Sequence, residues 1–344
     1  MADTAARHRR VAGDVEARVL AVLRSGRYVG GPVVEEAEAR IAASFGYRHG
    51  VGVNSGTDAL IYALMAMGVG PGDLVGVPAV TFFATAEAVV RVGATPVVVD
   101  VRADAPLLDA AVLPSGLRVV IAVHLFGEPC GLEIDVPVLD DSAQVAGAPT
   151  PIRTGNVAAA SFYPTKTLGA AGDGGIVLAD DPEVAAAARK LASHGMPRAY
   201  LHERVNGHVG ANCRLDAVQA AVLLGHLPDL AARVVRRRAI AARYDAELPE
   251  QVRRLPRATH NPVHQYVVRV PERDTLAARL REAGVETAIY YPIPVSAQPA
   301  LAGLSHPPTP NADTFCREAL ALPVQECLTD DEVDTVIALV RRLA

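Results

Sequence analysis

The strongest constraint on the fold is an alternation of two kinds of segment along the first two thirds of the chain. Short runs rich in valine and isoleucine alternate with longer, alanine-rich amphipathic segments. This pattern is typical of a mostly parallel central sheet flanked by helices, because parallel neighbours need a crossover connection. The predicted strands are residues 51–53, 74–77, 95–99, 119–123, 137–140, 158–162 and 175–178. The predicted helices between them are residues 57–67, 84–92 and 182–193.

The pattern changes after Arg214. Two long helices separated at Pro228, a short strand and two further helices are expected there, at residues 215–224, 230–248, 265–270, 274–283 and 330–343. A chain of 344 residues also exceeds the size at which one hydrophobic core usually stops growing. We therefore predict an α/β fold with a large domain at 1–226 and a smaller C-terminal α+β domain at 227–344.

Composition excludes several classes of protein. The formal net charge is −5 and aromatic residues make up 4% of the chain, so no nucleic-acid partner is expected. The longest apolar runs, such as residues 119–123, are too short to cross a bilayer, and the first ten residues lack the apolar core of a signal peptide. The four cysteines form no CxxC pair and no Cys/His cluster has zinc spacing. A cytoplasmic protein with no metal and no membrane partner is predicted.

A turn of small residues, NSGTD at 54–58, follows the first predicted strand and opens a helix. Such a turn leaves backbone N–H groups unpaired, and the helix dipole favours an anion such as phosphate beside them. For this segment alone, an ordinary helix N-cap is the simpler interpretation.

Two carboxylates, in DDSAQ at 140–144, come directly after an apolar strand. Ligands of α/β sheets bind at this end of the strands. A buried carboxylate facing a pyridine nitrogen would keep that nitrogen protonated, which makes the ring an electron sink, and Gln144 could reach the same ligand. A pair of helix-capping aspartates is the alternative.

Two further segments add reactive groups. Lys166 ends SFYPTK at 161–166, between apolar residues and a glycine-rich run at 169–175, so partial desolvation would lower its pKa and make it an imine-forming nucleophile. Ser161 could donate to a phosphate. GANCRLD at 210–216 opens a helix with an asparagine and an arginine that could bind phosphate or a sugar diphosphate. A surface lysine and a capping motif are the alternatives.

Read together, these segments resemble the DegT-type sugar aminotransferases of the fold-type-I pyridoxal-phosphate-dependent enzymes. The resemblance runs nearly end to end, and its order and spacing make it specific. The matching motifs are SGRYVGGP at 25–32, GTDAL at 56–60, GVGPGD at 68–73, TFFAT at 81–85, DDSAQ at 140–144, SFYPTK at 161–166, GDGG at 172–175, NCRLDAVQAAVL at 212–223 and YYPIPVSAQPAL at 290–301.

The resemblance implies a role for each matching residue. Lys166 is implied to carry pyridoxal 5'-phosphate (PLP) as a Schiff base and to shuttle protons between cofactor and substrate. Asp141 is implied to pair with the pyridine nitrogen, Gln144 to lie near the phenolic oxygen, and Phe82 to stack against the ring. The implied phosphate-binding residues are Gly56, Thr57, Ser161 and, in the site of the neighbouring subunit, Asn212.

The implied sugar-facing residues are Tyr28, Arg214, Tyr290 and Tyr291. Because the family's site is shared between subunits, the resemblance also implies a homodimer. Three departures occur: Thr167 replaces a common asparagine after the lysine, Tyr290 stands where many members carry histidine, and the stretch from Val123 to Pro137 is shortened, away from the named site. None of these removes a catalytic group.

The expected reaction is transfer of an amino group from an amino donor, usually L-glutamate in this family, to an oxo-sugar. Lys166 favours transamination, because the related deoxygenating enzymes carry histidine there. The motifs resemble members acting on 3-oxo nucleotide sugars more than the 4-oxo group. Three alternatives stay open: a 4-oxo sugar acceptor, an oxo-cyclitol of antibiotic biosynthesis, and a non-catalytic, regulatory PLP-binding protein.

Overall fold

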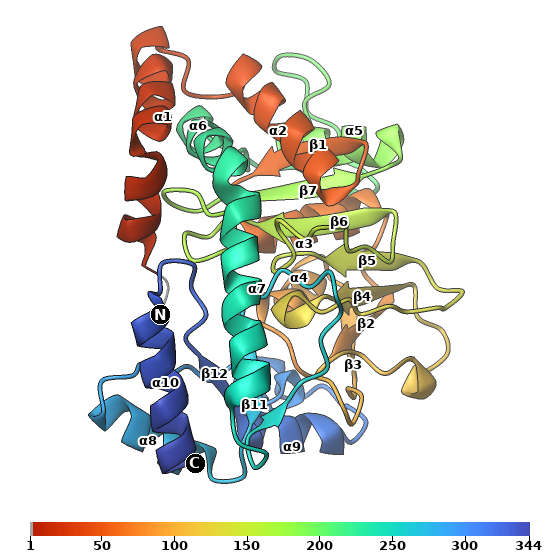
Figure 1. The fold of residues 1–344 in the computed structure, drawn as a ribbon. Helices are drawn as coiled ribbons and strands as arrows, with labels where there is room; N and C mark the ends of the chain where they lie inside the picture. Colours follow the sequence, from red (N-terminus) through yellow and green to blue (C-terminus); the bar gives the residue numbers. More distant parts are fainter. Residues whose placement is uncertain (1–2) are drawn as a thin grey trace.

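The computed structural model describes residues 3–344. Of the first ten residues, which lack the apolar core of a signal peptide, Met1 and Ala2 lie outside the described range. Within that range, the main sheet has seven strands in the order β1-β7-β6-β5-β4-β2-β3 (Figure 1). The strands are β1 (His49–Val53), β2 (Leu74–Pro78), β3 (Thr95–Val99), β4 (Val119–Val123), β5 (Val138–Asp141), β6 (Val157–Ser161) and β7 (Gly175–Ala179). β7 runs antiparallel to both of its neighbours, β1 and β6, and the other pairs are parallel. The expected mostly parallel sheet is confirmed.

Helices cover both faces of this sheet. Successive strand residues point to opposite faces, and in β6 Val157 and Ala159 belong to one hydrophobic cluster whereas Ala158 and Ala160 belong to the other. The first cluster contains residues of α3 (Gly56–Ala66), α4 (Ala84–Arg91) and α5 (Pro182–Leu191). The second contains residues of α1 (Thr4–Ser25), α2 (Pro32–Phe45) and α6 (Ala217–His226). The result is a three-layer α/β arrangement.

The predicted strands and helices of this region agree with the structure to within a few residues at each end. The predictions missed α1 and α2, although together they supply much of one helical layer. They also did not anticipate the short hairpin of β8 (Arg204–Val205) and β9 (His208–Val209).

A single rod of helix joins the upper and lower parts of the molecule (Figure 1). It consists of α6, a 3₁₀ turn at Leu227–Asp229 and α7 (Leu230–Glu247). Pro228 lies in that turn, where the sequence predicts a break between two helices. Because the flanking residues keep right-handed helical dihedral angles, the break is limited to this single 3₁₀ turn. The rod meets the length and composition of a membrane-crossing helix, but 56% of its most apolar window is buried inside the protein.

The C-terminal part builds a separate small sheet. Its antiparallel order is β10-β11-β12. The elements are β10 (Arg253–Arg254), β11 (Tyr266–Arg269), α8 (Arg273–Glu282), α9 (Pro310–Glu318), β12 (Ala319–Leu322) and α10 (Asp330–Leu343). Helices α8 and α10 pack with the sheet around a hydrophobic cluster whose members all lie between residues 240 and 343, whereas the buried residues of α9 belong to the first cluster of the main sheet. The boundary between residues 226 and 227 stays a prediction.

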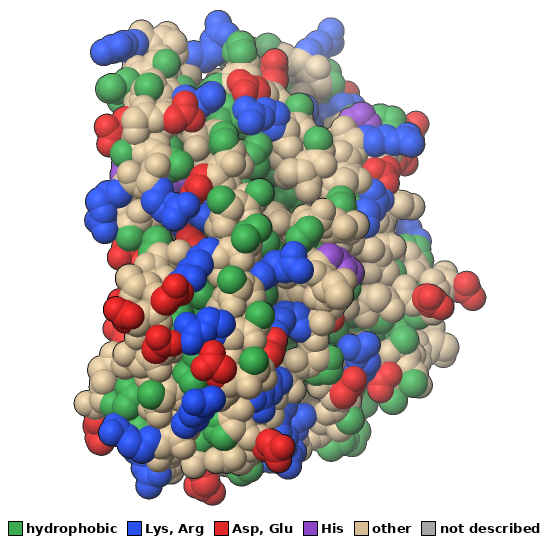
Figure 2. Space-filling model, in the orientation of Figure 1, with side chains coloured by type: hydrophobic (Ala, Val, Ile, Leu, Met, Phe, Trp, Pro, Cys, Tyr) green, Lys and Arg blue, Asp and Glu red, His purple; other side chains and the backbone are tan. Residues whose placement is uncertain are grey.

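On the face that Figure 2 shows, basic and acidic side chains are interspersed. α7 carries arginines that pair with carboxylates. Examples are Arg236 with Asp330 at 2.8 Å and Arg243 with Glu247 at 3.0 Å.

Candidate active site

A cavity of about 570 Å³ opens where the parallel strands of the main sheet end. Asp141 is the last residue of β5 and Ser161 the last of β6, and both line it. Residues of the C-terminal part close the opposite side. The lining side chains used below are Gly56, Thr57, Phe82, Asp141, Gln144, Ser161, Tyr163, Lys166, His264, Gln265, Tyr290 and Tyr291.

The amino end of α3 and the end of β6 form one wall. The Ser55 hydroxyl accepts the Asp58 N–H at 3.0 Å, which leaves the N–H groups of Gly56 and Thr57 as the first unpaired donors of the helix. A Cβ added to Gly56 would lie 2.6 Å from the Ser161 Cβ, so only glycine allows this approach. Two backbone donors, a serine hydroxyl and the helix dipole together fit a phosphate group.

The neighbouring carboxylates of β5 have different surroundings because they point to opposite faces of the sheet. Asp140 is fully buried and accepts hydrogen bonds from the Tyr47 hydroxyl at 2.7 Å and from the Thr154 and Gly155 N–H groups at 2.9 Å. Burial alone would raise the pKa of Asp140, but hydrogen bonds from His124 and Tyr47 hold it below its usual range. Asp140 is therefore a structural anion.

Asp141 faces the cavity. Its carboxylate accepts the Thr85 hydroxyl at 3.0 Å and the Ala143 N–H at 3.2 Å. Burial raises the pKa of Asp141, and these two donors and the Lys166 ammonium oppose that rise. A cationic ring nitrogen beside this carboxylate would stabilise its ionised form further, so the surroundings fit a pyridinium group.

Lys166 reaches the same cavity from a tight loop at residues 163–169, here called the lysine loop. Its backbone N–H donates to the Tyr163 carbonyl at 2.8 Å, and a Cβ on Gly169 would lie 2.5 Å from the Pro164 carbonyl oxygen. Burial lowers the pKa of Lys166 from 10.5 to about 8, while the Asp141 carboxylate opposes this change. Near neutral pH, a fraction of the protein molecules therefore carries Lys166 as the neutral amine that imine formation requires.

Aromatic and amide side chains complete the walls. The rings of Phe82 and Tyr291 lie with their centroids 6.2 Å apart, and Phe82 is 60% exposed. The Gln144 side-chain oxygen accepts the Phe126 N–H at 2.5 Å, which fixes the amide on the cavity wall. The cavity thus offers an exposed aromatic face to a planar ring.

Known proteins share both the sequence and the fold. The model of the DegT/DnrJ/EryC1/StrS aminotransferase family matches residues 10–341. The chain belongs to this aminotransferase family. A UDP-2-acetamido-2-deoxy-3-oxo-D-glucuronate aminotransferase of Pseudomonas aeruginosa is 37% identical, over 96% of each chain. A dTDP-3-amino-3,4,6-trideoxy-alpha-D-glucose transaminase of Streptomyces venezuelae is 39% identical, over 99% of this chain and 95% of the other. The crystal structure of DesV from S. venezuelae matches with a TM-score of 0.91 at 38% identity, covering 99% and 96% of the two chains.

The structure of this aminotransferase brings together most residues expected at the site. Lys166, Gly56, Thr57, Phe82, Asp141, Gln144, Ser161, Tyr290 and Tyr291 line the cavity. Three expected residues, Tyr28, Asn212 and Arg214, do not line it. Tyr28 and Asn212 are exposed, and Arg214 is half-buried. The residue after Tyr28, Val29, forms an isolated β-bridge with Asp216, which directly precedes α6.

Sequence reasoning missed several residues that shape the cavity of this aminotransferase. His264 and Gln265 enter it from the loop before β11, and Thr85 supports Asp141 from α4. The His264 Nδ1 lies 3.3 Å from the Thr167 hydroxyl, so the threonine that departs from the family pattern contacts this histidine. Thr85 ends the TFFAT motif and Gln265 starts a predicted strand, but neither was assigned a role, and His264 lies in no predicted segment.

The Lys166 amine of the apoprotein is expected to titrate near pH 8. The unfolded chain keeps this proton up to about its ordinary value of 10.5, so the unfolded state binds more protons between these values. Lys166 therefore makes the apoprotein more stable as the pH rises through this window.

Competitive amine labelling read by peptide mass spectrometry measures this titration. Lys166 and Lys190 are the two lysines of the chain, and Lys190 is exposed on α5. A Lys190→Arg background therefore isolates Lys166. A midpoint at the ordinary lysine value would contradict the desolvated environment.

Proposed function

We propose that this protein transfers an amino group from L-glutamate to a 3-oxo nucleotide sugar with PLP as cofactor. The observation that carries the proposal is the convergence on one cavity of Lys166, Asp141 and the α3–Ser161 wall. An amine of lowered pKa, a buried carboxylate and a phosphate-binding helix end are the three groups that PLP needs. The 3-oxo position is supported by the activities after which the two relatives from P. aeruginosa and S. venezuelae are named.

Each residue of the site has a proposed task. When bound, PLP supplies an electron sink that lets an amino group leave the donor and join the acceptor carbonyl. Lys166 would hold the cofactor covalently through Nζ and then move protons at the reacting carbons. Asp141 would keep the ring nitrogen protonated, and Gly56, Thr57 and Ser161 would bind the phosphate. Phe82 would cover the ring, with Gln144 near its oxygen substituent.

The test uses the purified holoprotein. Adding L-glutamate should convert the visible absorption band to that of the amine form of the cofactor and release 2-oxoglutarate. A panel of 3-oxo and 4-oxo nucleotide sugars and oxo-cyclitols, scored by product mass, then identifies the acceptor. No spectral change with any amino donor would support a regulatory, non-catalytic protein, and conversion of 4-oxo sugars or oxo-cyclitols alone would replace the proposed acceptor.

We also propose a cytoplasmic homodimer whose active sites are shared between subunits. The supporting observation is that Asn212, Arg214 and Tyr28 lie outside the cavity of their own chain. Asn212 would reach the cofactor phosphate of the partner, while Tyr28, Arg214, Tyr290 and Tyr291 would contact the sugar.

A subunit-mixing experiment should detect the shared site. Lys166→Ala and Asn212→Ala variants, each nearly inactive alone, are unfolded together and refolded as a mixture. If Asn212 acts in the partner's site, about one quarter of the native sites regain both residues. A mixture as inactive as its parents would show that both residues serve the same subunit's site. Wild type mixed with the Lys166→Ala/Asn212→Ala double variant is the control for refolding.

A further inference from the structure

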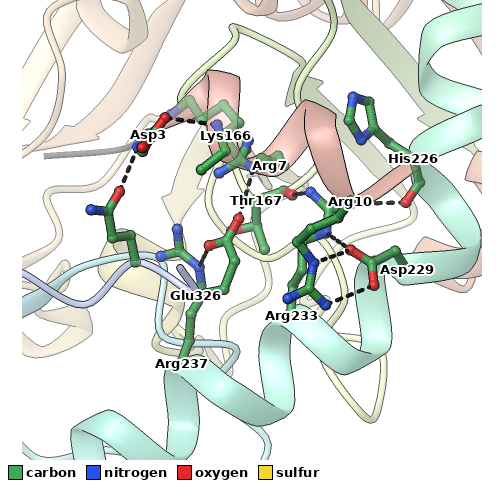
Figure 3. A network of polar contacts seen from close by, with 12 residues as sticks. Asp3, Arg7, Arg10, Lys166, Thr167, His226, Asp229, Arg233, Arg237 and Glu326 are labelled. Carbon is green, nitrogen blue, oxygen red and sulfur yellow. Dashed lines mark hydrogen bonds and ion pairs between the residues drawn. The ribbon is translucent and has the colours of Figure 1, made fainter. Parts of the chain in front are cut away.

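Three arginines are buried directly behind the lysine loop. Arg7 of α1 is 3% exposed, and Arg233 and Arg237 of α7 are 0% and 3% exposed. Arginine rarely occupies such positions unless its charge and its five donors are matched. Figure 3 shows Arg7 and Arg237 on either side of Glu326, close to Lys166 and Thr167.

Two of these arginines bind the backbone of the lysine loop. The Arg7 guanidinium donates from one nitrogen to the Pro164 carbonyl at 3.0 Å and to the Lys166 carbonyl at 2.8 Å. The Arg233 guanidinium donates to the Thr167 carbonyl at 2.9 Å. The carbonyl of the proposed catalytic lysine and that of the next residue are therefore both held by cations.

Glu326, which follows β12 in the C-terminal part, fixes the arginines in turn. Its two carboxylate oxygens accept from the Arg7 Nε and the Arg237 Nε, each at 2.7 Å. Burial would raise the pKa of Glu326, but the two guanidinium charges hold it at about 2, so the carboxylate is ionised throughout the working range. Arg237 also donates to the carbonyls of Val263 at 3.2 Å and His264 at 3.1 Å, on the loop that enters the cavity.

We propose that Arg7 and Glu326 are positioning residues that aim Lys166 into the cavity by clamping the lysine loop. The inference rests on the proposed function, in which Lys166 is the catalytic amine. Through Arg7 and Glu326, the clamp connects the first turns of α1 and the segment after β12 to the reacting nitrogen. A rigid, planar guanidinium suits this task because its donors have a fixed geometry.

A purely structural ion pair is the competing interpretation. It predicts that breaking the clamp lowers stability but leaves each folded site unchanged. A positioning role predicts altered chemistry at Lys166 in molecules that remain folded.

The test compares Arg7→Met and Glu326→Gln with a matched control in a Lys190→Arg background. The control is Arg236→Met, because Arg236 also joins α7 to the segment after β12, through Asp330 and the Leu328 carbonyl, without contacting the lysine loop. Melting temperature and circular dichroism establish the folded fraction. Two readouts follow: the pH midpoint of Lys166 labelling in the apoprotein, and kcat and KM for L-glutamate in the holoprotein.

Arg7→Met is expected to lower kcat by about 10- to 100-fold with little change in the KM for glutamate, since a displaced reacting group loses this much. The labelling midpoint of Lys166 should rise toward its ordinary value, because a loosened loop is better solvated and a nearby positive charge is gone. Glu326→Gln should lower kcat in the same range, and Arg236→Met should change neither readout.

If Arg7→Met does not fold, Arg7→Lys is tested in its place. Lysine keeps the buried positive charge, but its single ammonium group lacks the planar, fixed donor geometry with which the guanidinium binds the two loop carbonyls and Glu326 at once. The clamp is overturned if the folded variants melt at lower temperature yet keep the parent's kcat and Lys166 midpoint. That result differs from failure of the proposed function, in which Lys166→Arg itself would retain the cofactor's visible band and turnover.

Discussion

Lys166→Arg is expected to abolish transamination, lowering kcat by about 10⁴-fold or more. Arginine keeps the positive charge, but its guanidinium does not lose a proton and so cannot bind an aldehyde or accept a proton from a substrate carbon. Proton transfer by a positioned side chain alone contributes up to about 10⁴-fold, and the covalent link is lost as well. The visible absorption band should disappear, and borohydride should no longer attach the cofactor to the peptide that contains residue 166.

Lys190→Arg is the matched control, because Lys190 is the other lysine of the chain and is exposed on α5. It should retain full turnover, and borohydride should still label residue 166. If Lys166→Arg kept the band and the activity while Lys190→Arg lost them, the assignment of the catalytic amine would be wrong.

The adjacent carboxylates of β5 are expected to separate catalysis from stability. Asp141→Asn should lower kcat/KM by about 10²- to 10³-fold, because a neutral amide cannot stabilise a cationic ring nitrogen as a buried carboxylate does. Its melting temperature should change little, since asparagine can still accept from Thr85 or Ala143. Asp140→Asn should instead lower the free energy of unfolding by about 3 kcal/mol, because it weakens several buried charged hydrogen bonds.

Steady-state kinetics and thermal unfolding of both variants check this pair. Asp141→Asn is expected to keep the parent's melting temperature and lose activity. Asp140→Asn is expected to melt at a lower temperature and keep the parent's activity per folded molecule. Equal losses of activity for the two variants, after correction for the folded fraction, would contradict the different roles that we assign to the two faces of β5.

The main sheet was predictable because each strand is a short apolar run between clear turns. The direction of β7 was not, because a run such as residues 175–179 packs equally well in either direction. α1 was missed because apolar and charged residues are mixed along it and only a narrow stripe, including Val15 and Val22, is buried. β12 was missed because its four residues ALAL have no period that separates strand from helix.

The lining of the cavity was predictable where a motif ends or directly follows a strand, as for Asp141, Ser161 and Lys166. It was not predictable where the side chain arrives from a loop that carries no motif, as for His264 and Gln265. The clamp could not be recognised at all from the sequence. Arg7 is one of many arginines, and its proposed positioning role depends on a contact with a glutamate 319 positions away in the sequence.

That separation has a consequence for how the protein matures. Residue 7 leaves the ribosome long before residue 326, so the support behind Lys166 is assembled only after residue 326 has emerged. Contacts between such distant positions form late because the chain between them must first be ordered. Until then a nascent chain carries Lys166 on an unsupported loop, and capture of the cofactor is expected to follow the emergence of residue 326.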